Sequence, residues 1–125
     1  MNRLTWTACS AVVFFGLSMA AQAGVLSTPY LNTSGSTQYA ACLAVNVSAK
    51  PHDIKVEILN ADYGTVQQTA TCTAVAPQQD CFIFDSSTDV LWCRITVKGL
   101  KGTVRGDLMV RDSTTNSITS VVPAQ

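Results

Sequence analysis

The chain has 125 residues, with eight Lys and Arg against eight Asp and Glu, so its formal net charge at pH 7 is zero. Neither sign is gathered in a block, and the sequence lacks the basic stripe that is typical of proteins that bind nucleic acid. The composition therefore argues against a nucleic-acid partner.

The first 23 residues are predicted to be a secretory signal peptide. Arg3 places a positive charge near the start, residues 4–19 are mostly apolar, and residues 21–23 form a small-x-small cleavage site. The apolar part is shorter than the roughly 20 residues that cross a bilayer, so no membrane span is expected in the mature chain. Residues 24–125 are then a single domain, secreted or periplasmic, that is large enough to bury a modest core.

Four cysteines remain after this cleavage: Cys42, Cys72, Cys81 and Cys93. In an oxidising compartment they are expected to form disulfides, for which three connectivities exist. We favour Cys72–Cys81, which flanks a turn-like segment, together with Cys42–Cys93, which ties an early strand to a late one. The spacing C-x-x-C of zinc and redox sites does not occur in the sequence, and no cofactor is expected.

Strand signals follow one another along the domain. Residues 24–38 are polar with a few apolar anchors, and they fit an edge strand or a loosely held arm. Residues 39–47 are apolar on both parities, which indicates a central strand that is covered on both sides. Further strands are expected at residues 54–58, 66–75, 81–84, 91–98, 104–111 and 118–122.

The clearest pattern is the alternation of apolar and polar residues in 91–98 and again in 104–111. Such alternation is typical of strands with one buried and one exposed face. Gly99 and Gly102 lie between the two runs and supply positive φ for a tight turn. We therefore predict that the two strands pair as a hairpin, with Cys93 on its inward face.

About seven short strands with regularly spaced turns predict an all-β fold, an antiparallel immunoglobulin-like β-sandwich stapled by disulfides. The label is meant in the broad architectural sense, because Trp92 is adjacent to the second cysteine of the Cys42–Cys93 pair rather than midway between the two.

The order of the motifs resembles a group of small secreted bacterial proteins of uncharacterised function. The resemblance lies in six elements in this order: Cys42-x-x-x-Asn46, Ile54-x-Val56-x-Ile58, Cys72…Pro77…Cys81, Trp92-Cys93-Arg94-Ile95-Thr96-Val97-x-Gly99, Val104-Arg105-Gly106-Asp107-Leu108 and Val122-Pro123-Ala124. It implies a fold and no activity.

Arg105-Gly106-Asp107 spells the tripeptide that integrin ligands display at the tip of a loop. Here it lies within an alternating strand, where an ion pair of Asp107 with Lys98 or Arg94 on a neighbouring strand would explain it without a receptor.

Trp92 is on the outward parity of its strand. An exposed Trp can anchor a protein or glycan partner, or it can cover a sheet face under a neighbouring loop. The candidate interaction residues are thus Trp92, Arg105 and Asp107.

Neither of two polar groups makes a convincing catalytic or metal site. His52 and Asp53 adjoin in a predicted turn, and G-x-S-x-G is missing from the sequence. Asp85 and Asp89 could offer oxygens to calcium, but their loop lacks the Gly and the closing Glu of an EF-hand. We expect neither catalytic residues nor a bound metal.

The sequence is best interpreted as a secreted or periplasmic, non-catalytic protein that binds or has a structural role, with self-association left open. One alternative is a fimbrial or pilus-like subunit that exchanges a strand with its neighbour. Residues 24–38 would be a weak donor, because their apolar residues do not alternate. A metal-binding protein or an enzyme is the other alternative.

Overall fold

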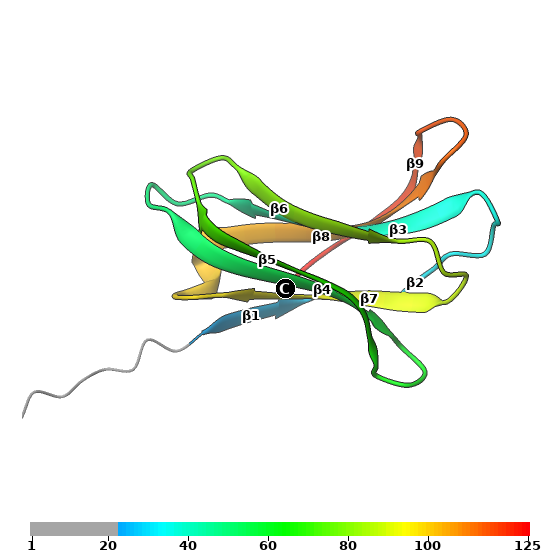
Figure 1. Ribbon diagram of the computed structural model, residues 1–125, viewed down its shortest axis with the longest axis horizontal. Coiled ribbons are helices and arrows are strands. Elements are labelled where there is room, and N and C mark those ends of the chain that lie inside the picture. The colour runs from blue at the N-terminus through cyan, green and yellow to red at the C-terminus, as the bar shows by residue number, and fades with distance from the viewer. Residues whose placement is uncertain (1–22) are drawn as a thin grey trace, which may run out of the picture.

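The computed structural model describes residues 23–125, which form two stacked β-sheets (Figure 1). The predicted signal peptide, Ala23 apart, lies outside the described residues. The nine strands of the described part are β1 (Gly24–Ser27), β2 (Leu31–Asn32), β3 (Gln38–Asn46), β4 (His52–Asn60), β5 (Val66–Val75), β6 (Asp80–Asp85), β7 (Val90–Val97), β8 (Val104–Asp112) and β9 (Ile118–Pro123).

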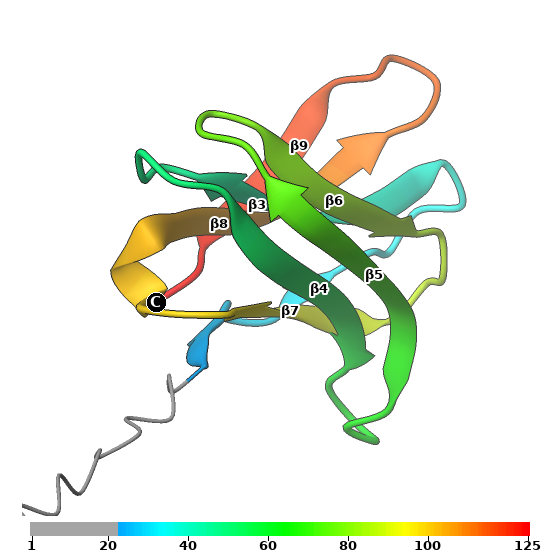
Figure 2. The same cartoon turned by 60° about the vertical axis from the view of Figure 1, so that its left-hand side comes forward.

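Sheet A has the strand order β1-β7-β4-β5, with β2 also paired to β7, and sheet B has the order β6-β3-β8-β9 (Figures 1 and 2). Neighbouring strands are antiparallel throughout both sheets. The predicted antiparallel fold is confirmed. It has nine strands rather than about seven, because the segment 24–38 contributes both β1 and β2. The immunoglobulin-like label stays a prediction.

The core lies between the sheets and is built from one parity of each strand. In β7, the residues Leu91, Cys93, Ile95 and Val97 are fully buried, whereas the residues between them are half-buried. The same alternation runs through β3 and β8. Successive side chains in a strand point to opposite faces, so each sheet presents one apolar face to the other and keeps an outer face.

The predicted hairpin of residues 91–98 and 104–111 is wrong in its pairing, although both strands exist. β7 belongs to sheet A and β8 to sheet B, and a 3-10 turn at Lys101–Thr103 carries the chain from one layer to the other. Gly99 does adopt a positive φ, of 130°, within this connection. Alternation shows that a strand has a buried face but not which strand it pairs with, and here the buried faces meet across the core.

Both predicted disulfides are confirmed, and each joins sheet A to sheet B. Cys42 of β3 is bonded to Cys93 of β7 between two interior strands, with the Cα atoms 5.8 Å apart. Cys72 of β5 is bonded to Cys81 of β6, which joins the edge strands of the two sheets. The segment between them is a turn, in which the Gln79 N–H donates to the Ala76 carbonyl over 3.0 Å.

The N-terminal segment is part of sheet A. β1 pairs with β7 from Gly24 opposite Val97 to Ser27 opposite Arg94, and β2 continues along the same strand. The backbones of Ser27 and Gln125 also exchange two hydrogen bonds, of 3.2 and 3.0 Å. Of the two interpretations of residues 24–38, the structure thus supports the edge strand.

Candidate functional site

The outer face of sheet A is polar and carries a compact charge network. Glu57 of β4 is only 4% exposed. Its carboxylate accepts a hydrogen bond from Arg94 Nε of β7 over 2.8 Å and lies 2.7 Å from Lys55 Nζ. The hydrogen bond from Arg94 is the main cause that holds the pKa of Glu57 below its ordinary value, and burial opposes this shift.

Replacing Glu57 by Gln is expected to lower the free energy of unfolding at pH 7 by about 1–2 kcal/mol, because Arg94 loses a charged hydrogen-bond partner. A carboxylate whose pKa is lower in the folded state stabilises the fold above its unfolded pKa of roughly 4.3, and this contribution is lost as the pH falls through the folded value. As the pH is lowered below about 4.3, the free energy of unfolding should therefore fall less in the variant than in the wild type. Urea unfolding from pH 3 to pH 7 measures both effects. Equal free energies at pH 7 would contradict the first effect, and parallel pH profiles would contradict the second.

The outer face of sheet B is apolar and uncovered. Phe82 and Phe84 of β6 are 59% and 60% exposed, and Ile118 and Val121 of β9 are about half exposed. The outward residues of β3 between them are half-buried: Tyr39, Ala41, Leu43 and Val45. Residues 39–47 were expected to be covered on both sides, but the described chain covers only the inward side, where Ala40, Cys42 and Ala44 are fully buried.

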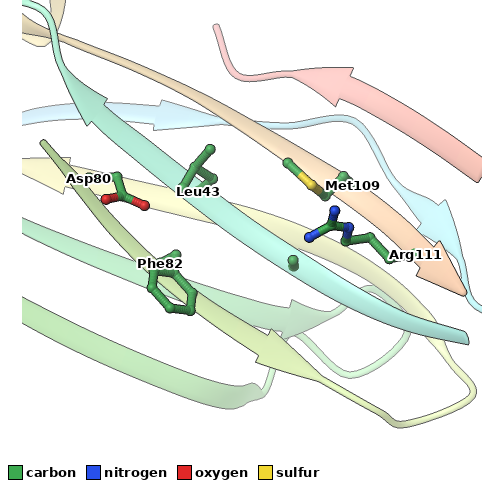
Figure 3. Close-up of a pocket in the computed structure, with 6 residues that line it drawn as sticks. Leu43, Asp80, Phe82, Met109 and Arg111 are labelled. Atoms are coloured by element: carbon green, nitrogen blue, oxygen red, sulfur yellow. The ribbon is translucent and has the colours of Figure 1, made fainter. Parts of the chain in front are cut away.

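Two shallow hollows lie on this face. The first has a volume of about 240 Å³ and is lined by Ala41, Leu43, Asp80, Phe82, Met109 and Arg111. Its lining comes from three adjacent strands, with Asp80 and Phe82 on β6, Leu43 on β3, and Met109 and Arg111 on β8 (Figure 3). The second hollow, of about 260 Å³, is lined by Tyr39, Phe84 and Ser86.

Charged residues of β8 border the apolar surface. Arg105, Asp107 and Arg111 alternate with the buried residues of this strand and so share its outer face. The Arg111 guanidinium extends from β8 toward β3 (Figure 3), and its Nε is buried without a hydrogen-bond partner among residues 23–125. Within the same residues, Glu57 is the only carboxylate that forms a salt bridge.

The predicted ion pair of Asp107 with Lys98 or Arg94 is wrong. Arg94 lies in β7 of sheet A and pairs with Glu57, and Lys98 directly follows that strand. Asp107 is in sheet B, where its neighbours across the strands are Leu43 and Pro123. The prediction depended on the hairpin, and it failed with that hairpin.

Arg105-Gly106-Asp107 lies inside a central strand rather than at a loop tip. Gly106 is buried, and a Cβ added there would clash with the Ile95 side chain and lie 2.7 Å from the Leu43 carbonyl oxygen. The close approach of the two sheets at this point therefore accounts for the glycine of the tripeptide.

Trp92 lies in sheet A, whereas the other two candidate interaction residues, Arg105 and Asp107, lie in sheet B. It is half-buried on the outer face of sheet A, directly opposite Leu59, which is 2% exposed. Directly opposed side chains of one face contact each other, so Trp92 helps to cover Leu59. Whether Trp92, Arg105 or Asp107 contacts a partner stays a prediction.

The aromatic residues of sheet B were not identified as a candidate site from the sequence. Phe82 and Phe84 share the parity opposite to Cys81, whose sulfur is buried, so their outward direction could have been inferred from the Cys72–Cys81 pair. Their proximity to Tyr39 could not, because it depends on the register of β6 against β3. The rings of Tyr39 and Phe84 lie edge to face, with their centroids 6.1 Å apart.

One carboxylate from each of the two polar groups, Asp53 and Asp85, accepts a hydrogen bond from the backbone. Asp53 Oδ1 accepts a hydrogen bond of 2.9 Å from Ala74 N–H, at a residue with φ of 50° in β5. Asp85 Oδ1 accepts one of 2.6 Å from Ser87 N–H. Across the described part of the chain, no group of three or more His, Cys, Asp and Glu side chains is placed to bind a metal ion.

Among residues 23–125, no helix has the length and apolar character needed to span a membrane. No family model matches the chain, and comparison with curated proteins and with solved structures gave no significant match. The resemblance to small secreted bacterial proteins stays a prediction.

Proposed function

We propose that the protein is a secreted or periplasmic, non-catalytic component that acts by binding a protein partner, and that it does so through the outer face of sheet B. The observation that carries the proposal is the uncovered aromatic surface around Phe82 and Phe84, each about 60% exposed. Contiguous apolar surfaces of this kind mark interaction sites on soluble proteins. The two disulfides suit an oxidising compartment.

The contrast between the two outer faces supports this choice of surface. Sheet A presents the network of Lys55, Glu57 and Arg94 beside the polar strand β5. Sheet B presents Phe, Tyr, Leu, Val and Met side chains bordered by a few charges. Aromatic residues, Met and Arg are enriched at protein interfaces, whereas Lys and Glu are depleted.

We prefer this proposal to the strand-exchanging subunit. A donor segment must be free to leave its own fold and to pair with a neighbouring subunit. Residues 24–27 and 31–32 instead pair with β7 of their own chain, and Ser27 is additionally hydrogen-bonded to Gln125.

The test is a photo-crosslinking amino acid, benzoylphenylalanine, placed at Phe84 or at Thr69 in cells that produce the protein. Thr69 is the matched control, because it is exposed on the outer face of sheet A opposite Glu57. Irradiation is expected to give discrete adducts of higher mass from position 84 and none from position 69. Equal adducts from both positions, or none from position 84, would contradict the proposal.

A further inference from the structure

We infer that the outer face of sheet B binds the same face of a second copy of this chain. The two copies are related by a twofold axis that runs across the strands at the level of Ala41. The inference rests on the proposed function of this face and adds the identity of the partner. It is carried by the arrangement of apolar and charged residues that the strand register imposes.

The register arranges this face in rows that cross the strands. The central row is Phe84, Ala41, Met109 and Val121. The row on one side is Phe82, Leu43, Asp107 and Pro123. The row on the other side is Tyr39, Arg111 and Ile118, with Ser86 beyond the end of β6. The central row carries no charge. Each flanking row carries one charged residue of β8, which is Asp107 in the first row and Arg111 in the second.

A twofold axis along the central row places each flanking row of one copy against the opposite flanking row of the other copy. Asp107 of each copy then faces Arg111 of the other, which gives two equivalent ion pairs. Both residues lack a salt-bridge partner within the described part of their own chain, and both side chains are only half-buried on this face. An isologous interface requires this kind of self-complementary pattern.

The apolar residues are complementary under the same rotation. Phe82 of one copy faces the hollow of about 260 Å³ that Tyr39, Phe84 and Ser86 line on the other. Leu43 faces Tyr39, and the uncharged central rows meet along the axis. A twofold axis along β3 would instead set Phe82 against Asp107 and leave that carboxylate buried without a partner, which is costly.

The size of the face sets the expected strength. Four strands at ~4.8 Å spacing and about seven residues at ~3.4 Å each give a projected area of roughly 450 Å² per copy. The two copies together give roughly 900 Å², which is below the roughly 1,200–2,000 Å² of specific, stable interfaces and is typical of weak, transient ones. The dimer is therefore expected to be reversible and to dissociate on dilution to roughly micromolar concentrations.

The test is sedimentation equilibrium of the purified, oxidised chain over a concentration series, with charge-swap variants. Asp107→Arg and Arg111→Asp each set like charges against each other, and each is expected to weaken the dimer at least tenfold. The double variant restores opposite charges and is expected to dimerise like the wild type. Arg105→Asp is the control, since the rotation carries Arg105 past the end of β8 in the second copy. It should leave the dimer within about twofold of the wild type.

Circular dichroism of each variant shows whether it is folded. Phe84→Asp, at an exposed position of an edge strand, tests the central row independently and should also give a monomer.

A wild type that is monomeric at every concentration would overturn the inference. So would a dimer that survives both single charge changes, or a double variant that stays monomeric. The proposed function would fail separately, if position 84 gave no adducts. Adducts with a different protein, from a chain that is monomeric alone, would keep the proposed function and overturn only the identity of the partner.

Discussion

Replacing Cys42 and Cys93 together by Ala is expected to lower the free energy of unfolding by about 4 kcal/mol. The bond closes a loop with a sequence separation of 51, and a loop of this length restricts the unfolded chain strongly. Both cysteines are fully buried between the sheets, so the shorter alanine side chains also remove packing there. Equilibrium unfolding in urea, followed by the fluorescence of Trp92, measures the loss.

The second disulfide provides the comparison. Cys72 and Cys81 are separated by only nine positions, so the same chain-entropy argument gives about 2.5 kcal/mol for replacing both by Ala. The order of the two losses is the result that matters. A larger loss from the Cys72–Cys81 pair would contradict loop closure as the main source of the stabilisation.

Replacing Gly106 by Ala is expected to lower the free energy of unfolding by about 3 kcal/mol, at the upper end of overpacking effects. The added methyl group would overlap the Ile95 side chain of the facing sheet and would lie 2.7 Å from the Leu43 carbonyl oxygen of the neighbouring strand. Ile95 can change its rotamer only within a close-packed core, and the backbone of β3 cannot retreat without breaking its pairing with β8. Thermal and urea unfolding measure the effect.

Gly102→Ala is the control, because a Cβ at Gly102 meets nothing within 4 Å. This variant should stay within about 0.5 kcal/mol of the wild type, as surface substitutions generally do. If Gly106→Ala were equally neutral, the close approach of the sheets would not explain the glycine, and the Arg105-Gly106-Asp107 tripeptide would need another explanation.

The strands could be predicted because their alternation is local. Leu91, Cys93, Ile95 and Val97 are apolar at every second position, and all four are buried in the structure. The pairing of strands could not be predicted in the same way. The connection after Gly99 is as compatible with a crossing between layers as with a tight turn, and the choice depends on packing across the core.

The candidate surface was only partly encoded in a recognisable pattern. The apolar residues on both parities of 39–47 predicted a cover on both sides of β3, but the described chain leaves its outer side only half-buried. The neighbours of β3 depend on long-range register, which sets Phe82 opposite Leu43 on one side and Asp107 opposite it on the other. The rows that make the face self-complementary are therefore a property of the assembled sheet.

The position of the Cys42–Cys93 bond has a mechanical consequence. Tension applied through the chain on either side of this bond passes from β3 to β7 across the sulfurs and bypasses everything between them. Strands β4, β5 and β6 then carry no load, so pulling can detach β1, β2, β8 and β9 but cannot extend the remainder. A molecule anchored at one end and pulled at the other should therefore stretch to a fixed limit and stop, and only a reducing agent should let it lengthen further.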